Sequence, residues 1–306
     1  MVLTKEKEGI IYGALSYMFW GLIPVYWKLL EHINALEILA NRVLWSFMFM
    51  ILLLIVTKKV PALFSYIKEI IVNRRKVLAL LAAAFLVSIN WGTFIWAVNN
   101  GRILETSLGY YINPLISVLL AVTVLKEKLS KVQVGSVCLA AIGVIILTVY
   151  SGQFPWISFT LAISFAFYGL VKVLIGADAA IGLTLETLMM VPIAAIYCFF
   201  LILQGNSMFF PISNSLLLMG GGVATAVPLL LFALGANSIP LSMLGFLQYI
   251  SPTLSLLVGV FLYHEAFTKV HGVAFLFIWS ALVLFSLSQM KMRSRIEKQV
   301  GEKVEV

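Results

Sequence analysis

The chain has 306 residues, of which 62% are hydrophobic and only 11% charged, and its mean hydropathy is +1.05. A soluble domain cannot cover its surface with so little charge, so a soluble globular fold is excluded. The net charge of +8 would suit a nucleic-acid binder, but Lys and Arg cluster between apolar stretches and at the C-terminus, as in membrane proteins. We therefore expect a lipid bilayer as the partner of this chain and no nucleic acid.

Ten stretches of about 20 mostly apolar residues follow one another, the length that a helix needs to cross about 30 Å of hydrocarbon. The first has no small-residue cleavage site after it, so we expect a retained helix rather than a removed signal peptide. The pattern predicts an all-α, polytopic membrane protein. Its ten transmembrane helices are expected at residues 9–27, 35–57, 77–99, 104–125, 132–150, 155–175, 180–204, 215–236, 241–263 and 270–290.

The longest connection, residues 58–76, is strongly basic, and its apolar side chains share one face of a helix. We expect this segment to lie in the membrane interface. Basic residues also indicate the orientation, since 17 of the 21 lie on the side of the N-terminus and three lie opposite, while Arg42 lies inside a span. The positive-inside rule then places both termini in the cytoplasm and the protein in the inner (cytoplasmic) membrane of the cell.

The polar positions of the sequence repeat. Residues 111–114 match residues 249–252 at an offset of 138, and the same offset pairs Glu127 with Glu265. Any two apolar helices resemble each other, but proline and glutamate shared at one fixed offset argue for a true repeat. Each copy holds five spans, an odd number, so the two copies cross the membrane in opposite senses, as in many secondary transporters. We expect a first repeat at residues 1–150, an inverted second repeat at 151–290 and a basic cytoplasmic tail at 291–306.

In the first repeat, Asn113 and Pro114, followed by Glu127, Gln133 and Gly135, resemble the repeated unit of the EamA family in the drug/metabolite transporter superfamily. Longer motifs resemble the RarD subfamily of that family. The resemblance implies ten helices, cytoplasmic termini and transport of drugs or metabolites, usually outward, and RarD members carry a chloramphenicol-sensitivity label. The motifs are Glu37-Ile38-Leu39, Arg42-Val43, Asn90-Trp91, Leu104-Glu105, Gln248-Tyr249-Ile250, Pro252-Thr253-Leu254 and residues 94–100, 107–110, 112–115 and 165–170.

Ionisable side chains inside a span are candidates for function, because each costs roughly 2.5–3.5 kcal/mol to insert at the centre of a helix. Arg42 lies about 10 Å below the start of its span, at 1.5 Å per residue. Glu105, at the start of another span, is in a position to pair with it. An ion pair that fixes two helices and a contact with substrate or proton remain open interpretations. The residues expected in gating or coupling are Glu37, Asn41, Arg42, Glu105 and Glu186, with Lys172 as the partner of Glu186.

Proline marks two equivalent positions near the middle of the membrane. Pro114 and Pro252 have no N–H group, so each leaves the carbonyl four residues earlier without its helical donor and predicts a kink. A free carbonyl at that depth is tolerated only against protein or a wet cavity, which suggests a substrate site, whereas the alternative is a kink that only shapes packing. Aromatic rings nearby suit a planar or amphipathic cargo. The expected substrate contacts are Tyr110, Tyr111, Asn113, Gln248, Tyr249, Asn90 and Trp91.

Motifs for catalysis and cofactor binding are missing from the sequence. It contains no P-loop, no G-x-S-x-G and no G-x-G-x-x-G after a strand, and His264-Glu265 with His271 lacks the spacing of a metal site. We therefore expect no enzyme activity, no metal and no cofactor. Glu127 and Glu265 are instead expected to form scaffold ion pairs with the lysine four residues later.

The favoured hypothesis is a secondary transporter, a drug/metabolite permease that exports a small-molecule substrate by alternating access around a midplane site. Because a nucleotide-binding site is missing, uphill transport would use an ion gradient or an exchanged solute. Alternatives from other classes are an intramembrane enzyme or sensor built on a carrier fold, and an uncoupled facilitator. The cargo and the oligomeric state stay open.

Overall fold

A computed structural model describes residues 2–99, 103–152, 156–262 and 268–304, and within these ranges the chain forms helices and no strand. The helices are α1 (Val2–Lys28), α2 (Ala35–Val56), α3 (Val60–Val72), α4 (Arg74–Asn99), α5 (Ile103–Thr123), α6 (Lys131–Ser151), α7 (Trp156–Ile175), α8 (Ala179–Leu203), α9 (Ile212–Ala236), α10 (Leu241–Leu247), α11 (Ile250–Leu262) and α12 (Lys269–Val304).

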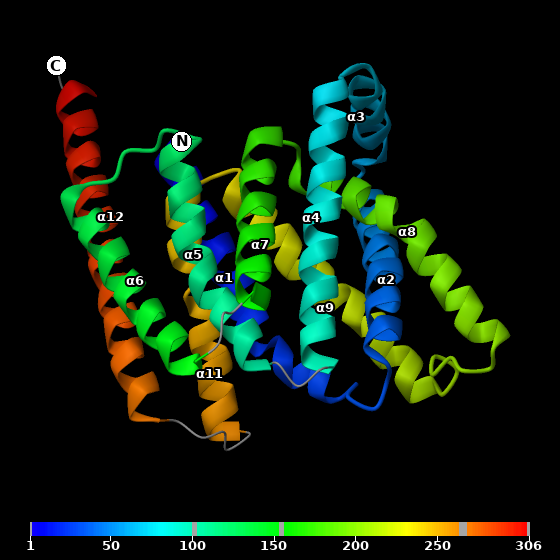
Figure 1. The fold of residues 1–306 in the computed structure, drawn as a ribbon. Coiled ribbons are helices and arrows are strands. Elements are labelled where there is room, and N and C mark those ends of the chain that lie inside the picture. Colours follow the sequence, from blue (N-terminus) through cyan, green and yellow to red (C-terminus); the bar gives the residue numbers. More distant parts are fainter. Residues whose placement is uncertain (1, 100–102, 153–155, 263–267, 305–306) are drawn as a thin grey trace.

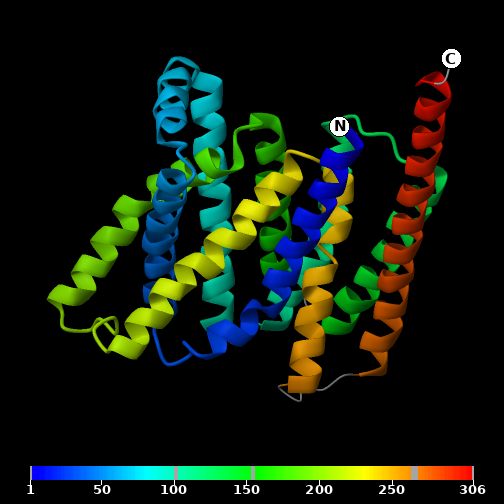
Figure 2. The ribbon, with the colours of Figure 1, turned by 180° about the vertical axis from the view of Figure 1, so that it is seen from behind.

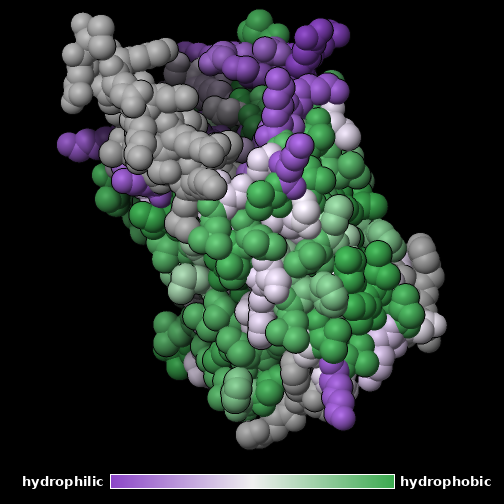
Figure 3. Space-filling model, turned by 90° about the vertical axis from the view of Figure 1, so that its left-hand side faces the viewer, coloured by the Kyte–Doolittle hydropathy of each residue, from purple (hydrophilic) through white to green (hydrophobic). Residues whose placement is uncertain are grey.

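The all-α, polytopic fold class is confirmed. Nine helical segments of the described ranges are long and apolar enough to cross a membrane, and one of them joins α10 and α11. The tenth is α5, which has 21 residues and a shorter apolar part, Leu108–Thr123. Figure 3 shows the consequence on one face of the molecule, where apolar residues cover the middle and hydrophilic residues collect toward the end that carries the termini.

The helices cross the molecule in the order that an inverted repeat requires. Both termini lie at one end, here called the terminus end, and α1 runs from it to the opposite or far end (Figures 1 and 2). Its counterpart α7 runs the other way, from the far end to the terminus end. Equivalent helices also have equivalent neighbours, since α1 packs on α9 and α11 while α7 packs on α4 and α5.

The spans that contain Pro114 and Pro252 differ, which corrects the expectation of matching kinks. Helix α5 continues through Pro114, whereas the predicted span 241–263 is divided into α10 and α11. The carbonyl of Gln248, expected to be free because Pro252 has no N–H group, accepts a hydrogen bond from the N–H of Ser251 at 3.0 Å. A tighter turn thus satisfies the group that the proline leaves unbonded.

Two other segments can be compared with their predictions. Helix α12 has 36 residues and continues to Val304, so most of the segment expected as a tail after residue 290 is helical. The basic connection does form a helix, α3, but only part of its apolar face packs on protein. Leu63 and Ile70 are buried, while Phe64 and Ile71 are exposed. A location in the membrane interface stays a prediction.

Helix α9 crosses α2 at very short distance because of Gly222. A Cβ atom on this glycine would lie 2.4 Å from Cβ of Trp45 and 2.7 Å from the backbone nitrogen of Ser46. The carbonyl of Gly222 also accepts a hydrogen bond from the Ser46 hydroxyl at 2.9 Å. Small residues at such crossings let two membrane helices approach closely, so that side chains of one helix can form hydrogen bonds with the backbone of the other.

Replacing Gly222 by alanine is expected to lower the thermal stability of the detergent-solubilised protein by about 1–3 kcal/mol, since helix α9 must move away from α2. The matched control is Gly135→Ala in α6, where an added Cβ meets no atom within 4 Å. That change should be neutral or slightly stabilising, because alanine favours a helix by about 1 kcal/mol over glycine. Equal melting temperatures for the two variants would contradict the close crossing.

Candidate functional site

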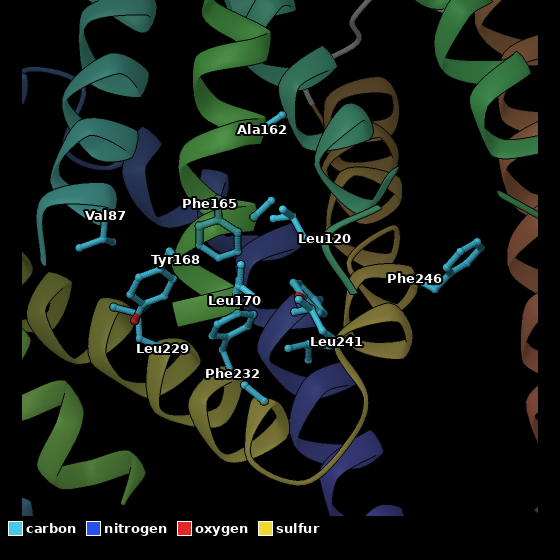
Figure 4. Packing of buried hydrophobic residues seen from close by; sticks show 14 of the residues in the cluster. Val87, Leu120, Ala162, Phe165, Tyr168, Leu170, Leu229, Phe232, Leu241 and Phe246 are labelled. Carbon is cyan, nitrogen blue, oxygen red and sulfur yellow. The ribbon is translucent and has the colours of Figure 1, made fainter. Parts of the chain in front are cut away.

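Aromatic rings fill the centre of the molecule, where α1, α7 and α9 meet. Phe232 of α9 stacks on Tyr168 of α7 at 5.9 Å and lies 5.4 Å from Phe165, all ring centroid distances (Figure 4). Helix α1 adds Tyr17 and Trp20, and the indole of Trp20 lies 5.4 Å from Phe165 in an edge-to-face contact. We call these five residues the central aromatic cluster. Tyr17 and Trp20 are the repeat equivalents of Phe165 and Tyr168 at an offset of 148, which also pairs Gly21 with Gly169.

Two predicted substrate contacts, Tyr111 and Tyr249, occupy equivalent positions but differ in bonding. The hydroxyl of Tyr111 donates to the carbonyl of Pro252 at 3.0 Å and so joins α5 to α11. The hydroxyl of Tyr249 is buried and has no hydrogen-bond partner among the described residues. A buried hydroxyl without a partner costs about 1–3 kcal/mol. The repeat is therefore symmetric in sequence and asymmetric in hydrogen bonding.

The predicted amide contacts bind the protein itself. The side-chain nitrogen of Asn113 donates to the carbonyl of Ala162 at 2.6 Å, and its oxygen accepts from Ser117 at 3.3 Å. Asn90 donates to the carbonyl of Leu161 at 2.9 Å. These bonds fix α5 and α4 on α7, so neither amide donor is free in this conformation. Gln248 is buried at the junction of α10 and α11.

Arg42 lies between the two halves in an aromatic setting. Its guanidinium carbon is 4.5 Å from the ring centroid of Trp27 in α1 and 5.1 Å from that of Trp91 in α4. Its Nε donates to the hydroxyl of Thr225 in α9 at 2.9 Å, and Tyr110 in α5 lies near it. The predicted partner Glu105 has a side chain outside the described part of the structure.

Glu186 and Lys172 form a buried ion pair, as expected from the sequence. The ammonium of Lys172 lies 2.6 Å from the Glu186 carboxylate, and the two side chains are only 7% and 3% exposed. The hydroxyl of Tyr168 donates to the other carboxylate oxygen at 3.0 Å. Glu186 and Tyr168 also border a small cavity beside Trp91 and Met190, which has room for about one water molecule. The pair thus links the central aromatic cluster to an internal space.

Glu37 closes the far end of the molecule. Its buried carboxylate accepts hydrogen bonds from the hydroxyl of Ser207 and the backbone N–H of Met208, both at 2.8 Å. These two residues lie in the loop between α8 and α9, so the bonds tie the first half to the second. We call this contact the far-end latch. Asn41, one turn later, donates to the carbonyl of Glu37 at 3.0 Å.

A second connection lies at the terminus end. The ammonium of Lys59 is 2.6 Å from the carboxylate of Asp178, which also caps helix α8 by accepting from the N–H groups of Ala180 and Ile181. We call the Lys59–Asp178 contact the terminus-end latch. Burial acts to raise the pKa of Asp178, but the hydrogen bonds from Lys59 and from Ile181 outweigh it and hold the pKa below its usual value.

The expected scaffold pair of Glu127 takes a different form. Its carboxylate accepts hydrogen bonds from the N–H of Leu241 at 2.8 Å and from the N–H of Ser242 at 3.2 Å. It therefore caps the first turn of α10 and joins the two repeats rather than stabilising its own helix end. The equivalent Glu265, like His264, lies outside the described residues.

Sequence reasoning missed three participants, Trp27, Thr225 and the terminus-end latch. Trp27 and Thr225 carry no local signal, because an aromatic ring or a threonine in a membrane span usually serves packing. Asp178, directly before an apolar run, has the form of a helix N-cap and was detectable as such. Its link to Lys59 depends on tertiary folding.

Comparison with known proteins identifies the family. Residues 7–149 match the EamA-like transporter family. The chain is 48% identical over 293 residues to the "Uncharacterized transporter YojE" of Bacillus subtilis (strain 168), covering 95% of this chain and 97% of that protein. It is 40% identical over 300 residues to "Protein RarD" of Escherichia coli (strain K12), covering 97% and 100%. The chain belongs to the RarD subfamily of the EamA family, in the drug/metabolite transporter superfamily.

More distant relatives agree with this assignment. The "Chloramphenicol-sensitive protein RarD" of Pseudomonas aeruginosa is 28% identical over 277 residues, covering 90% of this chain and 93% of that protein. A crystal structure of a protein that is 16% identical superimposes with a TM-score of 0.69 over 91% of this chain and 97% of that one. At that identity the likeness concerns the fold alone. The chain is thus a multi-span membrane transporter.

The buried ion pair leads to a stability prediction. Lys172→Met leaves the Glu186 carboxylate buried without its cation, and breaking such a pair costs about 3–5 kcal/mol. The double variant Lys172→Met with Glu186→Gln removes both charges and should regain most of this loss. Thermal unfolding in detergent is measured for the wild type, for Lys172→Met, for Glu186→Gln and for the double variant. Strictly additive losses would show that the two charges are not coupled.

The terminus-end latch leads to a pH prediction. Asp178→Asn keeps an N-cap of similar strength and removes only the charge. It should cost no more than about 1 kcal/mol at neutral pH, because both partners are partly exposed. Since the pKa of Asp178 is depressed by folding, the wild type keeps this increment above pH about 4 and loses it as pH falls through the folded pKa.

Melting temperatures measured between pH 6 and pH 3 compare the two proteins. The difference between wild type and Asp178→Asn should vanish at the acid end. Asp178→Ala, which also removes the cap, should cost about 1 kcal/mol more at every pH. A constant difference between wild type and Asp178→Asn would contradict the assignment of a charged latch.

Proposed function

We propose that this protein is a secondary transporter that exports small solutes by alternating access. Membership of a transporter family supports the movement of small molecules across a membrane. The bias of basic residues toward the N-terminal side favours a cytoplasmic location for the terminus end, in the cytoplasmic membrane. Cargo would bind near the midplane, between the two halves, and leave at the far end.

The observation that carries the proposal is the difference between Tyr111 and Tyr249. Inverted-repeat carriers reach their two states by letting each half adopt in turn the conformation of the other. Equivalent residues must then differ in any one state. Tyr111 is bonded across the halves to Pro252, while Tyr249 is buried without a partner.

The repeat suggests what the second state would contain. The equivalent of the Tyr111 bond to the Pro252 carbonyl is a bond from Tyr249 to the carbonyl of Pro114. Helix α10 already lies against that carbonyl, since a Cβ on Gly245 would be 3.3 Å from it. In our mechanism the Tyr111 bond breaks as the Tyr249 bond forms. The number of hydrogen bonds therefore stays the same, and the free-energy difference between the two states is small.

The two latches are proposed to alternate with this exchange. Opening toward the far end requires Glu37 to release Ser207 and Met208, and opening toward the terminus end requires Lys59 to release Asp178. Glu186 and Lys172 are the proposed coupling pair, because protonation of the carboxylate would weaken the ion pair beside the small cavity. Coupling by an exchanged solute in place of a proton would leave flux insensitive to a collapsed pH gradient.

Tyr249→Phe gives the sharpest test of the bond exchange. The change removes a hydroxyl that is unbonded here, so it should leave stability unchanged or raise it by about 1 kcal/mol while lowering flux. The matched variant is Tyr111→Phe, which deletes a formed bond and should lower stability by about 1 kcal/mol. Melting temperature and flux are measured for both. If both variants behave alike in both measurements, the exchange is wrong.

The transport proposal itself is tested with purified protein in lipid vesicles. Vesicles loaded with a panel of labelled amino acids, organic acids, sugars and chloramphenicol are assayed for exchange and net flux, with protein-free vesicles as the control. Saturable flux of at least one solute is expected. Specific binding of a solute without any flux would favour the intramembrane sensor instead, and chemical conversion of a solute would favour an enzyme.

A further inference from the structure

Arg42 differs from the other cation buried in the membrane region. Lys172 is neutralised by Glu186 at 2.6 Å. Among the side chains that the structure describes, no carboxylate lies within ion-pair distance of Arg42. A lone positive charge about 10 Å inside a span is costly. Among the described side chains, Arg42 is thus a partly buried cation without a carboxylate partner, as Glu37 is a buried carboxylate with only neutral donors.

The guanidinium of Arg42 is held so that one edge stays available. The hydroxyl of Thr225 accepts from Nε at 2.9 Å and donates to the carbonyl of Gly221 at 2.7 Å, so both its hydrogen-bonding roles are used. None of the hydrogen bonds among the described residues involves Nη1 or Nη2 of Arg42. These two nitrogens form the fork that binds both oxygens of a carboxylate.

The surroundings of that fork are aromatic and come from both halves. Trp27 and Trp91 flank the guanidinium at 4.5 Å and 5.1 Å, and Tyr110 lies nearby. Arg42 and these three rings belong to the first half, whereas Thr225 belongs to the second. All four of the first-half residues are partly exposed. Gly221 of α9 packs beside them, since a Cβ there would lie at an ordinary contact distance of 3.4 Å from the Trp27 ring.

We propose that Arg42 binds the carboxylate of a small amphipathic organic acid, whose apolar body packs against Trp27 and Trp91. The single positive charge of the Arg42 guanidinium matches one negative charge, which favours a monocarboxylate over a phosphate dianion. The indoles supply apolar surface for the body of the ligand and keep the guanidinium oriented by cation–π attraction. This inference rests on the proposed transport function, because it names the chemical class of the cargo.

The experiment measures ligand binding to the full-length protein in detergent, in a buffer free of carboxylates. The probes are benzoate and hexanoate, with methyl benzoate and benzamide as neutral counterparts and inorganic phosphate as a second anion. Titration calorimetry and melting temperature should show saturable binding of the carboxylates. The neutral probes should bind at least about tenfold more weakly because they lack the charge-assisted bidentate contact, and phosphate because it has no apolar body to pack on the indoles.

The variants test the role of each group. Arg42→Gln should weaken benzoate binding at least about tenfold, and Arg42→Lys should keep part of the affinity because the charge remains without the fork. Thr225→Val keeps the charge but frees Nε, so it should weaken binding by a smaller factor. The matched control is Arg75→Gln, which removes an exposed arginine at the start of α4 and should change nothing.

Several outcomes would overturn the proposal. Equal affinity of wild type and Arg42→Gln for benzoate would place the anion elsewhere, and equal affinity for benzoate and phosphate would make the site a general anion site. The proposal is also wrong if the wild type binds none of the carboxylates while Arg42→Gln and Glu105→Gln lower the melting temperature equally. In that case Arg42 is the structural partner of Glu105.

Failure of this inference is separable from failure of the transport proposal. Vesicles that carry neutral solutes but no carboxylate would overturn the assigned cargo and leave the transporter intact. Protein that binds benzoate through Arg42 in detergent, yet moves no solute in vesicles, would overturn transport and leave the binding site intact.

Discussion

The central aromatic cluster joins the two halves at the centre of the molecule through side chains of α1, α7 and α9. Lipid tails are as apolar as leucine, so helices in a membrane gain little from apolar burial alone and associate through close packing and specific contacts. Tyr17 and Trp20 meet Phe165 and Tyr168 around Phe232 in tilted, edge-on and stacked geometries. Because each repeat supplies one pair of rings, the cluster lies where the two halves meet.

The polar groups around this centre are compensated in three different ways. Glu186 has a cation, Lys172, and a hydroxyl donor, Tyr168. Glu37 has only neutral donors, from Ser207 and Met208. Arg42 has aromatic faces and one hydroxyl. These arrangements stabilise the three charges to different degrees. The free energy needed to exchange a partner is lowest for the charges that their present partners stabilise least.

Much of the architecture was predictable from the sequence, because span length, charge bias and the repeat are all long-range statistical features. The ten spans, the helix in residues 58–76 and the pairing of Lys172 with Glu186 all follow from apolar runs and from charges placed on facing turns. The division of the ninth span was not predictable from Pro252 alone. Pro114 sits at the same repeat position and leaves α5 continuous, so neighbouring helices decide the outcome.

The candidate site was predictable only in part, for a related reason. Asn90 and Asn113 were expected as substrate contacts, whereas in the structure their amide groups donate hydrogen bonds to carbonyls of α7. Trp27 and Thr225 come to Arg42 from α1 and α9, which are distant in sequence and carry no charge to mark them. Side chains that take part in a site only because folding brings them next to a distant residue produce no pattern in the sequence.

Helix α12 extends far beyond what the membrane requires. Its 36 residues span about 54 Å at 1.5 Å per residue, whereas the hydrocarbon layer is about 30 Å thick. The helix packs along α6, beside the rest of the bundle (Figures 1 and 2). The surplus length continues the helix as a rod beyond its apolar span, Lys269–Ser288. A small tilt of the α6–α12 pair would move the end of this rod farther than it moves the side chains near the centre of the pair. A fluorophore at the C-terminus would therefore report tilting of these two helices.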